Sequence, residues 1–262
     1  MELLSMMLVG IGVGTFGTMI GLGGGLILVP LFMFTMLAPN GTTFETVQQV
    51  IGTSLFAVAC NSVSGCYAYL RQKRIMFRAA IPFALATIPG AAAGSLVSKY
   101  FNGASFSIAF GMLLAVLGCF MYWKSNSKRA TASADDFDPA TAQFNMPLGV
   151  VLTFGVGFIS TIFGIGGGII DVPMMVFILG FPTQIAVASS TFILMTSSLI
   201  GTISHGLLGH IVWLPAVCIG LGCVFGAQLG ARISKKSKPK MLVVILSVTM
   251  VCMGIQLIYR GM

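Results

Sequence analysis

Charged residues are scarce in this sequence, and their scarcity excludes most soluble folds. Only 8% of the 262 residues are charged, whereas an average soluble domain carries about 25%. Hydrophobic residues make up 56% of the chain, and the mean hydropathy is +0.99. A water-soluble protein of this size could not cover such a core with polar surface. We therefore predict an integral membrane protein.

Several functional patterns are also missing. No CxxC motif is present and no histidine is spaced for metal ligation, so we interpret the cysteines as small buried hydrophobes and expect no metal site. There is no P-loop, which argues against an ATP-driven pump. The GxGxxG match at Gly12–Gly17 follows no strand and has no acidic residue about 20 positions later, so it does not indicate dinucleotide binding. We expect no cofactor.

What the sequence does contain is a series of apolar stretches of roughly 20 residues or more, the length that crosses about 30 Å of hydrocarbon. Several such stretches predict a multi-pass all-α protein in the lipid bilayer. Met1–Leu4 lacks a basic region, so we expect no cleaved signal peptide. The net charge of +8 comes from short loops between spans rather than from a basic patch with aromatics, and we expect no nucleic-acid partner.

The most informative feature is an internal duplication. Residues 14–31 match residues 157–174 at an offset of 143, and residues from about 54 onward match at an offset of 136. The identical pairs of the first match are Gly14/Gly157, Thr18/Thr161, Gly21/Gly164, Gly23/Gly166, Gly24/Gly167, Gly25/Gly168, Val29/Val172 and Pro30/Pro173. Two homologous repeats follow, 1–124 and 146–262, joined by a polar cytoplasmic linker at 125–145 whose composition does not suit lipid.

Each repeat begins with a long apolar segment, 3–38 or 147–180, followed by three ordinary spans. The predicted spans are 47–70, 78–98 and 105–123 in the first repeat and 184–207, 213–231 and 241–259 in the second. A helix of 36 residues would measure about 54 Å, nearly twice the hydrocarbon thickness. We expect each long segment to break at GLGGG or GIGGG, because consecutive glycines remove side-chain constraint, and to form a V of two short helices.

The loop charges favour an inverted arrangement of the two repeats. If the repeats are inverted, twelve of the 14 basic residues face the cytoplasm, as the positive-inside rule requires, whereas a parallel duplication divides them almost evenly. The twelve are Arg71, Lys73, Arg74, Arg78, Lys124, Lys128, Arg129, Arg232, Lys235, Lys236, Lys238 and Lys240. Both termini are then expected outside the cytoplasm.

Inverted repeats with broken helices place a binding site near the midplane between them. The helices that leave the bends would start at Gly23, Gly24 and Gly25 and at Gly166, Gly167 and Gly168, where free N–H groups and helix dipoles suit an anion. The alternative is that these glycines only allow close helix packing. The next span of each repeat carries a polar stripe, which either binds the anion or joins helices. Its residues are Thr53, Ser54, Asn61, Ser62, Gly65 and Tyr69 in the first repeat, and Ser189, Ser190, Thr191, Ser197, Ser198, Gly201 and His205 in the second.

Three ionisable residues lie within the apolar repeats. Asp171 stands where the first repeat has Leu28, and it is either a proton-coupling group or a solvated residue near the membrane edge. His205 is either a titrating residue of the stripe or a hydrogen-bonded structural imidazole. Glu45 is interpreted as a solvated acid at the start of a span.

The paired G-x-GGG-x-x-x-x-P bends, the span starts GTSL (52–55) and ASST (188–191), the stretch HGLLGHIVW (205–213) and the G-A-x-x-G repeats resemble the sulfite exporter TauE/SafE family of membrane permeases. The resemblance covers nearly the whole chain except the linker. It implies ion-gradient-driven transport of small sulfur-containing anions such as sulfite, sulfonates or sulfoacetate across a bacterial inner membrane. Asp171 and the Tyr69/His205 difference depart from internal symmetry.

Our leading hypothesis is an alternating-access transporter of a small anion, coupled to protons or sodium. The alternatives are a passive anion channel and a membrane-embedded hydrolase that uses Ser204 or Ser198 with His205. Adjacent residues on a helix point about 100° apart, which disfavours the pair Ser204 and His205. The exact anion, the direction of transport and the oligomeric state stay open, and a homo-oligomer is compatible with the sequence.

Overall fold

The computed structural model describes residues 3–37, 43–97, 100, 103–125, 144–163 and 167–261. Within these ranges the chain is helical, and the only β-pairing is an isolated bridge between Leu37 and Phe44. The first repeat comprises α1 (Leu3–Ile20), α2 (Gly25–Thr35), α3 (Val47–Arg71), α4 (Phe77–Val97) and α5 (Gly103–Lys124). The second comprises α7 (Met146–Phe163), α8 (Gly168–Pro173), the π-helix η2 (Met174–Ile178), α9 (Thr183–Leu207), α10 (Trp213–Lys236) and α11 (Pro239–Gly261).

Eight of these helices are long and apolar enough to cross a membrane, namely α1, α3, α4, α5, α7, α9, α10 and α11. The predicted multi-pass all-α class is therefore confirmed. The six later spans were predicted close to their observed bounds. The largest difference is at the end of α10, which was expected at residue 231 and continues to Lys236. Arg232, Lys235 and Lys236 are exposed there, so the helix continues as a charged segment beyond its apolar part.

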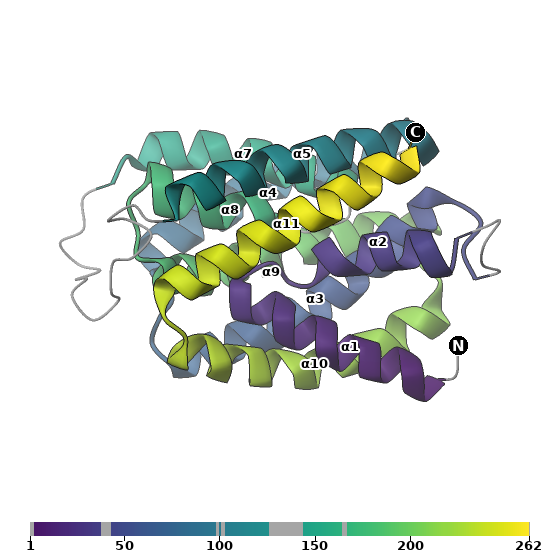
Figure 1. Ribbon diagram of the computed structural model, residues 1–262, viewed down its shortest axis with the longest axis horizontal. Coiled ribbons are helices and arrows are strands. Elements are labelled where there is room, and N and C mark those ends of the chain that lie inside the picture. Colours follow the sequence, from purple (N-terminus) through teal and green to yellow (C-terminus); the bar gives the residue numbers. More distant parts are fainter. Residues whose placement is uncertain are drawn as a thin grey trace.

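The first long segment breaks where the glycines predicted. Helix α1 ends at Ile20 and α2 begins at Gly25, and α2 turns back from α1 in Figure 1. Gly21, Gly23 and Gly24 have φ angles of 80°, 67° and 89°, a region that is costly for residues with a side chain. One expectation was wrong in detail. The first arm is not a short helix, because α1 has 18 residues and is itself a candidate span, while α2 has 11.

The second long segment has the same break but a different outgoing arm. Gly167, with φ of 102°, precedes α8, which passes directly into the π-helix η2. Proline lacks an amide hydrogen and removes a helical hydrogen bond, and Pro173 ends α8 at this point. Pro30 occupies the corresponding position inside α2, which stays α-helical. Proline alone therefore does not explain the π turn.

The first helix of each repeat packs against a helix of the other repeat. Helix α1 packs along α10 of the second repeat, and α7 packs along α4 of the first. Glycines make both contacts close, because a Cβ on Gly226 would overlap the carbonyl oxygen of Ile11 and a Cβ on Gly90 would overlap that of Phe154. These two contacts are related by the offsets of the duplication. The sequence repeat is thus also a repeat of helix contacts.

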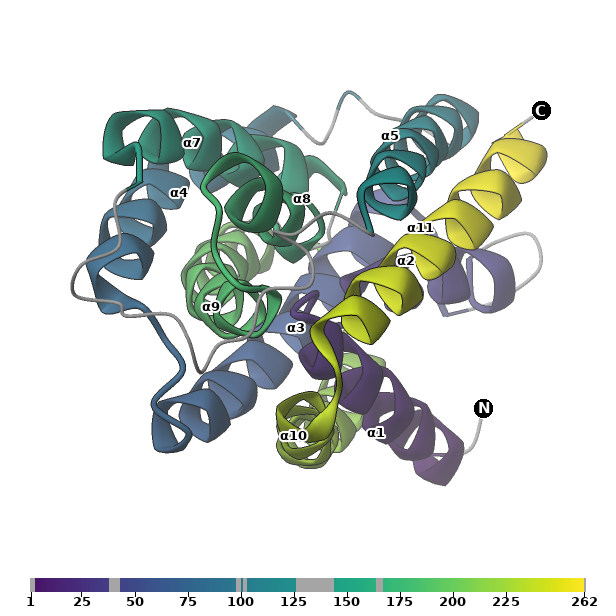
Figure 2. The same ribbon diagram turned by 60° about the vertical axis from the view of Figure 1, so that its left-hand side comes forward.

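Helices α3 and α9 pack against each other in the middle of the molecule (Figure 2). Gly52 lies against His205 at one end of this contact and Gly65 lies against Thr191 at the other, so the two helices run antiparallel. Helices α5 and α11 are also antiparallel, since Gly111 lies against Gly254 and Ile258 whereas Gly118 lies against Ser247 and Val251. Helices that correspond in the duplication therefore run in opposite directions in both pairs.

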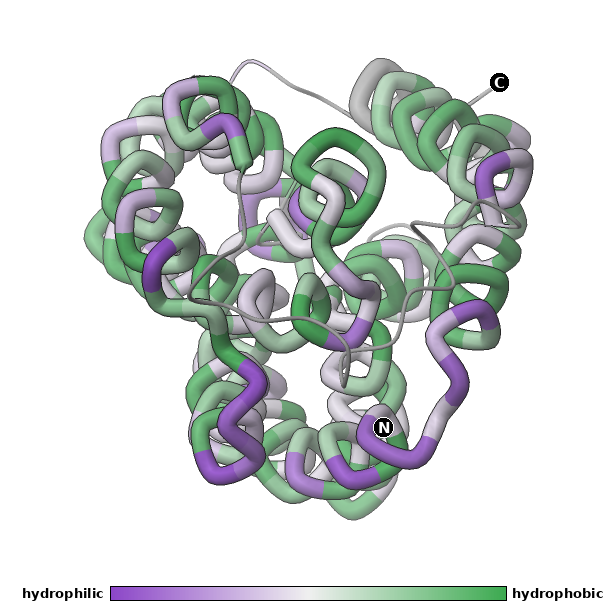
Figure 3. The backbone as a smooth tube through the Cα atoms, turned by 90° about the vertical axis from the view of Figure 1, so that its left-hand side faces the viewer, coloured by the Kyte–Doolittle hydropathy of each residue, from purple (hydrophilic) through white to green (hydrophobic). Residues whose placement is uncertain are grey.

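Basic residues collect at one end of the bundle. Arg71 and Gln72 at the end of α3 share a cavity with Arg232 at the end of α10, and Lys240 lines another cavity beside the end of α5, whose last residue is Lys124. Figure 3 looks at this end and shows hydrophilic connections between hydrophobic helices. Helix α1 begins and α11 ends at the opposite end of the bundle (Figure 1).

Candidate functional site

The two glycine bends touch each other at the centre of the protein. A Cβ on Gly168 would overlap the carbonyl oxygen of Gly21 and lie 2.9 Å from Cα of Leu22. Only a glycine at position 168 allows the backbones to approach this closely. The sequence predicted the bends, and the structure brings one of them against the start of the helix that follows the other.

Both outgoing helices begin with an equivalent glycine. The carbonyl of Gly24 accepts from the N–H groups of Ile27 and Leu28, and that of Gly167 accepts from Ile170 and Asp171. Among the described residues, no acceptor is present for the N–H groups of Gly24, Gly25 and Gly168. The start of α2 therefore offers donors without an acceptor among the described residues, together with the positive end of a helix dipole. Gly166, which the sequence also predicted here, lies outside the described residues.

Asn61 lies beside the last turns of α1, just before the first bend. It is fully buried on α3, its Oδ1 accepts a hydrogen bond from Thr18 Oγ1 at 3.1 Å, and Gly14 packs directly against it. Its Nδ2 has no partner among the described residues. A buried amide donor without a partner costs free energy, about 1 to 3 kcal/mol in typical cases. Such a donor is suited to a ligand that supplies an acceptor when it binds and removes it when it dissociates.

Thr18, at the end of α1, was not predicted as a site residue and is a centre of this cluster. Its carbonyl oxygen accepts from the hydroxyl of Tyr69 at 2.7 Å and from the N–H of Gly21 at 3.2 Å. Ser190 on α9 donates to the carbonyl of Gly21 at 3.3 Å. The identity of Thr18 with Thr161 in the duplication was the signal that could have identified it.

The hydroxyls of Thr53 and Ser189, which were predicted to bind the anion, bond backbone N–H groups instead. Thr53 Oγ1 accepts from the N–H of Val212 at 3.1 Å, and Ser189 Oγ accepts from the N–H of Met76 at 3.0 Å. These two bonds correspond to each other under the offset of 136. Each hydroxyl fixes the chain just before a helix of the other repeat, so in this conformation both contact backbone rather than the bends.

Three further stripe residues bond within their own helices. Ser54 donates to the carbonyl of Ile51, Thr191 to that of Val187 and Ser197 to that of Leu194. This local bonding satisfies a hydroxyl in an apolar environment. The side chain of Thr191 also packs against Gly65 of α3, which places it in the contact between α3 and α9.

Asp171 lies in the first turn of α8 and is fully buried. Neither carboxylate oxygen has a hydrogen-bond partner among the described residues. A Cβ on Gly167 would lie 3.2 Å from Asp171 Oδ2 and 3.5 Å from Ser160 Oγ, so the carboxyl lies beside the second bend. This burial contradicts the alternative of a solvated residue at the membrane edge. Burying a carboxyl without a partner is expensive, so Asp171 is a candidate functional residue.

His205 lies away from the bends. Its Nδ1 is 3.1 Å from Nδ1 of His210, and its Cβ lies beside Gly52 near the start of α3. Its Nε2 has no partner among the described residues. The corresponding Tyr69 reaches the carbonyl of Thr18, so the two repeats differ at this position. The expected binding role of His205 therefore has no support from its position in this conformation.

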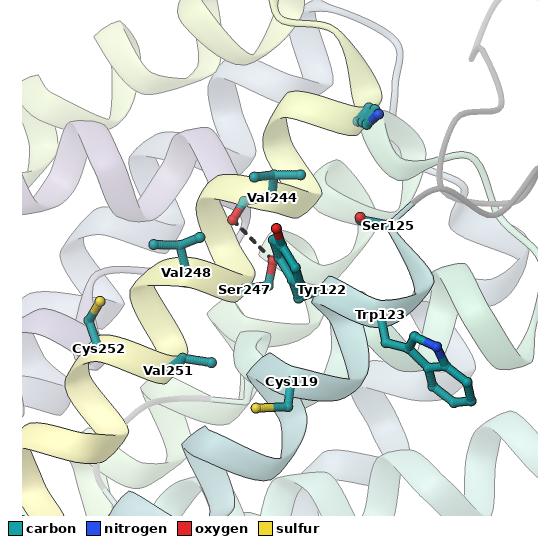
Figure 4. Close-up of a pocket in the computed structure, with 10 residues that line it drawn as sticks. Cys119, Tyr122, Trp123, Ser125, Val244, Ser247, Val248, Val251 and Cys252 are labelled. Atoms are coloured by element: carbon teal, nitrogen blue, oxygen red, sulfur yellow. Dashed lines mark hydrogen bonds between the residues drawn. The ribbon is translucent and has the colours of Figure 1, made fainter.

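A further cavity lies elsewhere, between α5 and α11 (Figure 4). It measures about 730 Å³, and among the described residues Lys240 is the charged residue that lines it. The hydroxyl of Ser247 is already bonded to carbonyls of its own helix, at 2.8 Å to Val243 and 3.0 Å to Val244. This cavity offers little to an anion. The contact of the two bends is the better candidate site.

Comparison with known proteins agrees with the fold and the bends. The profile of the family described as Sulfite exporter TauE/SafE matches residues 6–257, which include both bends, six of the eight candidate spans in full and most of the first and last. The chain belongs to the sulfite exporter TauE/SafE family. The match extends across both repeats, so the TauE/SafE assignment does not rest on one short motif.

Relatives in this TauE/SafE family are named as transporters. The chain is 35% identical to the probable membrane transporter protein YunE of Bacillus subtilis, over 100% of this chain and 99% of the relative. It is 28% identical to a probable membrane transporter protein of Methanocaldococcus jannaschii, over 95% and 93%. With Escherichia coli YfcA, also named a probable membrane transporter protein, identity is 21% over 90% and 82%. No solved structure gives a significant match. The protein is thus a multi-pass membrane protein of a transporter family.

Proposed function

We propose that this protein is a secondary transporter of small anions, and that the anion binds where the two glycine bends meet. The observation that carries the proposal is Nδ2 of Asn61, which has no partner among the described residues and is fully buried beside Thr18, just before the first bend. The N–H groups of Gly24 and Gly25 begin the outgoing helix of the same bend. Neutral donors of this kind bind an anion without placing a fixed positive charge in lipid.

The substrate class follows from the family description and from the donors. Sulfite, a sulfonate or sulfoacetate presents several oxygen acceptors to amide and hydroxyl donors. The family profile is that of sulfite exporters, which supports this class. We further propose transport in a bacterial cytoplasmic membrane, where an ion gradient can drive it.

Asp171 is the proposed coupling group. An anion and an ionised carboxylate repel each other in a medium of low dielectric constant. Protonation of Asp171 would remove that repulsion at the second bend, which touches the first bend through Gly168 and Gly21. Proton and anion would then move together. Sodium coupling is the alternative, and it would leave flux independent of a pH gradient.

The proposed transport cycle is alternating access between inverted repeats. The antiparallel pairs α3/α9 and α5/α11 support this arrangement, as does the collection of basic residues at one end of the bundle. That end would face the cytoplasm, and both termini would lie outside it. The bends are closely packed here, since a Cβ on Gly23 would meet Val58 at 2.9 Å. Substrate entry then requires a movement between the repeats.

The hydrolase alternative has less support. Ser198 Oγ lies 3.2 Å from Ser62 Oγ and donates to Met195, and His205 is paired with His210. No hydrogen bond joins His205 to Ser198 or Ser204 in the described part of the chain. A positioned nucleophile and base would require one.

Flux of labelled sulfite and of a sulfonate into proteoliposomes tests the proposed function. A transporter gives saturable uptake that accumulates the anion above its outside concentration when a proton gradient is applied. Sulfate and a carboxylate serve as competitors that define the class. Uptake that never exceeds equilibration would indicate a channel, and an absence of flux for every anion would reject the proposal.

A further inference from the structure

A small basic cavity lies at the ends of α3 and α10, separate from the bends. Four exposed cations, Arg71, Arg232, Lys235 and Lys236, line a cavity of about 320 Å³ together with Gln72 and Gln228. Both helices are candidate spans that end here. They run parallel, since Phe56 lies against Gly220 whereas Gln72 bonds the carbonyl of Ala231. The cavity therefore lies at the height of a membrane surface.

These four cations have no carboxylate partner among the described residues. The described acids are Glu45, at the opposite end of α3, and Asp171, at the second bend. Arg71 lies over the ring of Tyr67, with its Cζ 5.2 Å from the ring centroid. Four positive charges around a small cavity favour an anionic group with several oxygens, such as a phosphate.

An apolar groove continues from this cavity along the same helices. It measures about 710 Å³, and both cavities are lined by Gln228. Its walls come from α3, α9 and α10 and include Phe56, Val63, Tyr67, Leu199 and Phe225. Gln228 is held at this junction because its Nε2 donates to the carbonyl and the hydroxyl of Ser64, both at 2.8 Å.

The length of the groove matches one leaflet of a bilayer. Phe56 and Tyr67 mark its extent along α3, and eleven residues of helix rise about 16 Å. Half of a typical hydrocarbon core is about 15 Å. Arg71 lies one turn beyond Tyr67, at the level of a headgroup. The two cavities together thus have the polarity and the dimensions of one phospholipid molecule.

We propose that this surface is a binding site for an anionic phospholipid, with the phosphate among Arg71, Arg232, Lys235 and Lys236 and one acyl chain in the groove of α3, α9 and α10. Basic pockets between spanning helices are known to bind acidic headgroups. Because α3 also carries Asn61 and packs against α9, a lipid here contacts the helices of the proposed transport site.

Native mass spectrometry and thermal unfolding of the detergent-purified protein test the site. We expect phosphatidylglycerol to bind and to raise the melting temperature, and phosphatidylcholine to do neither. Removal of two charges in R71Q/R232Q lowers the apparent affinity for phosphatidylglycerol about tenfold or more, since each cation near a membrane surface contributes about 1 kcal/mol. The matched control K124Q/K240Q removes two charges at the same end of the bundle and keeps the binding.

A second variant separates lipid from free phosphate. Val63→Trp fills the groove and leaves the cations in place, so it should weaken phosphatidylglycerol binding and leave any stabilisation by inorganic phosphate unchanged. Equal stabilisation by phosphate and by phosphatidylglycerol, with no effect of Val63→Trp, would overturn the lipid assignment. Equal binding of both lipids, or an equal loss in R71Q/R232Q and K124Q/K240Q, would overturn the site.

Discussion

Ser62 of α3 and Ser198 of α9 touch across the centre of the protein, with their Oγ atoms 3.2 Å apart and both side chains fully buried. The two residues correspond under the offset of 136, so each hydroxyl meets its own counterpart. A contact between equivalent residues lies on the axis that relates the repeats. It is therefore the point at which a relative movement of the repeats can be tested directly.

We expect the double variant S62C/S198C, in a background with the six native cysteines replaced by alanine, to form a disulfide on mild oxidation. The neighbouring Oγ positions are close enough for a sulfur–sulfur bond after a small adjustment. Anion flux should stop in the oxidised protein and return on reduction, because the cross-link holds α3 against α9. The reduced protein is its own control. Full flux in the oxidised protein would contradict a cycle in which this contact changes.

Replacing Asn61 by alanine should weaken anion binding without unfolding the protein. The variant removes the unpartnered Nδ2 donor, and a hydrogen bond to a charged group contributes about 1.5 to 3 kcal/mol. The concentration for half-maximal flux should rise roughly tenfold to a hundredfold. Asn61→Asp places a negative charge there and should abolish flux. Unchanged kinetics in Asn61→Ala would remove Asn61 from the site.

Valine at Gly24 or Gly167 should abolish flux. Both glycines have positive φ angles, 89° and 102°, where a branched side chain is strained. The matched controls are Gly12→Val and Gly155→Val, a pair related by the offset of 143 in which a Cβ meets nothing within 4 Å. Size-exclusion profiles establish that each variant folds. Equal flux in bend and control variants would show that the bends are not the site.

Two substitutions of Asp171 separate its stability cost from its function. Asp171→Asn should remove the dependence of flux on a proton gradient, because the amide cannot carry the proton. Asp171→Leu, which copies Leu28 of the first repeat, should raise the melting temperature while stopping coupled transport, since it removes a buried carboxyl without a described partner. A wild-type pH profile in Asp171→Asn would refute proton coupling through this residue.

Tyr69→Phe should reduce stability more than transport. The hydroxyl of Tyr69 donates to the carbonyl of Thr18 at 2.7 Å and holds the end of α1 just before the first bend. Its loss should cost about 1 kcal/mol. The control Tyr67→Phe, on the same helix, alters a half-exposed ring and should leave the melting temperature unchanged. Equal melting temperatures for both variants would show that this bond does not fix α1.

The course of the chain through the membrane could largely be predicted from local sequence properties. The length of the apolar stretches, the glycine triplets and the polar linker each determine the structure of their own part of the chain. The predicted spans and the first break are confirmed within a few residues. The lengths of the arms were less predictable. Helix α1 continues to Ile20, and η2 takes a π conformation that the sequence of Met174–Ile178 does not indicate.

The candidate site was predicted only in part, because it depends on the rotation and register of helices from different repeats. Ser190 bonds Gly21 of the first bend and Asn61 bonds Thr18 just before it, whereas Thr53 and Ser189, on the same stripe, accept from backbone N–H groups instead. Sequence spacing puts all four residues on polar faces of α3 and α9, and it cannot distinguish those that lie near the bend from those that bond backbone elsewhere.

The sequence by itself determined the membrane environment, the duplication, the places where the helices break and the family, since hydropathy and glycine freedom are properties of each segment alone. Only the tertiary structure decided that Gly168 meets Gly21, that Nδ2 of Asn61 has no partner among the described residues and that His205 lies against His210. These contacts join residues that are far apart in the chain. Their geometry is set by close packing between helices, which no segment specifies alone.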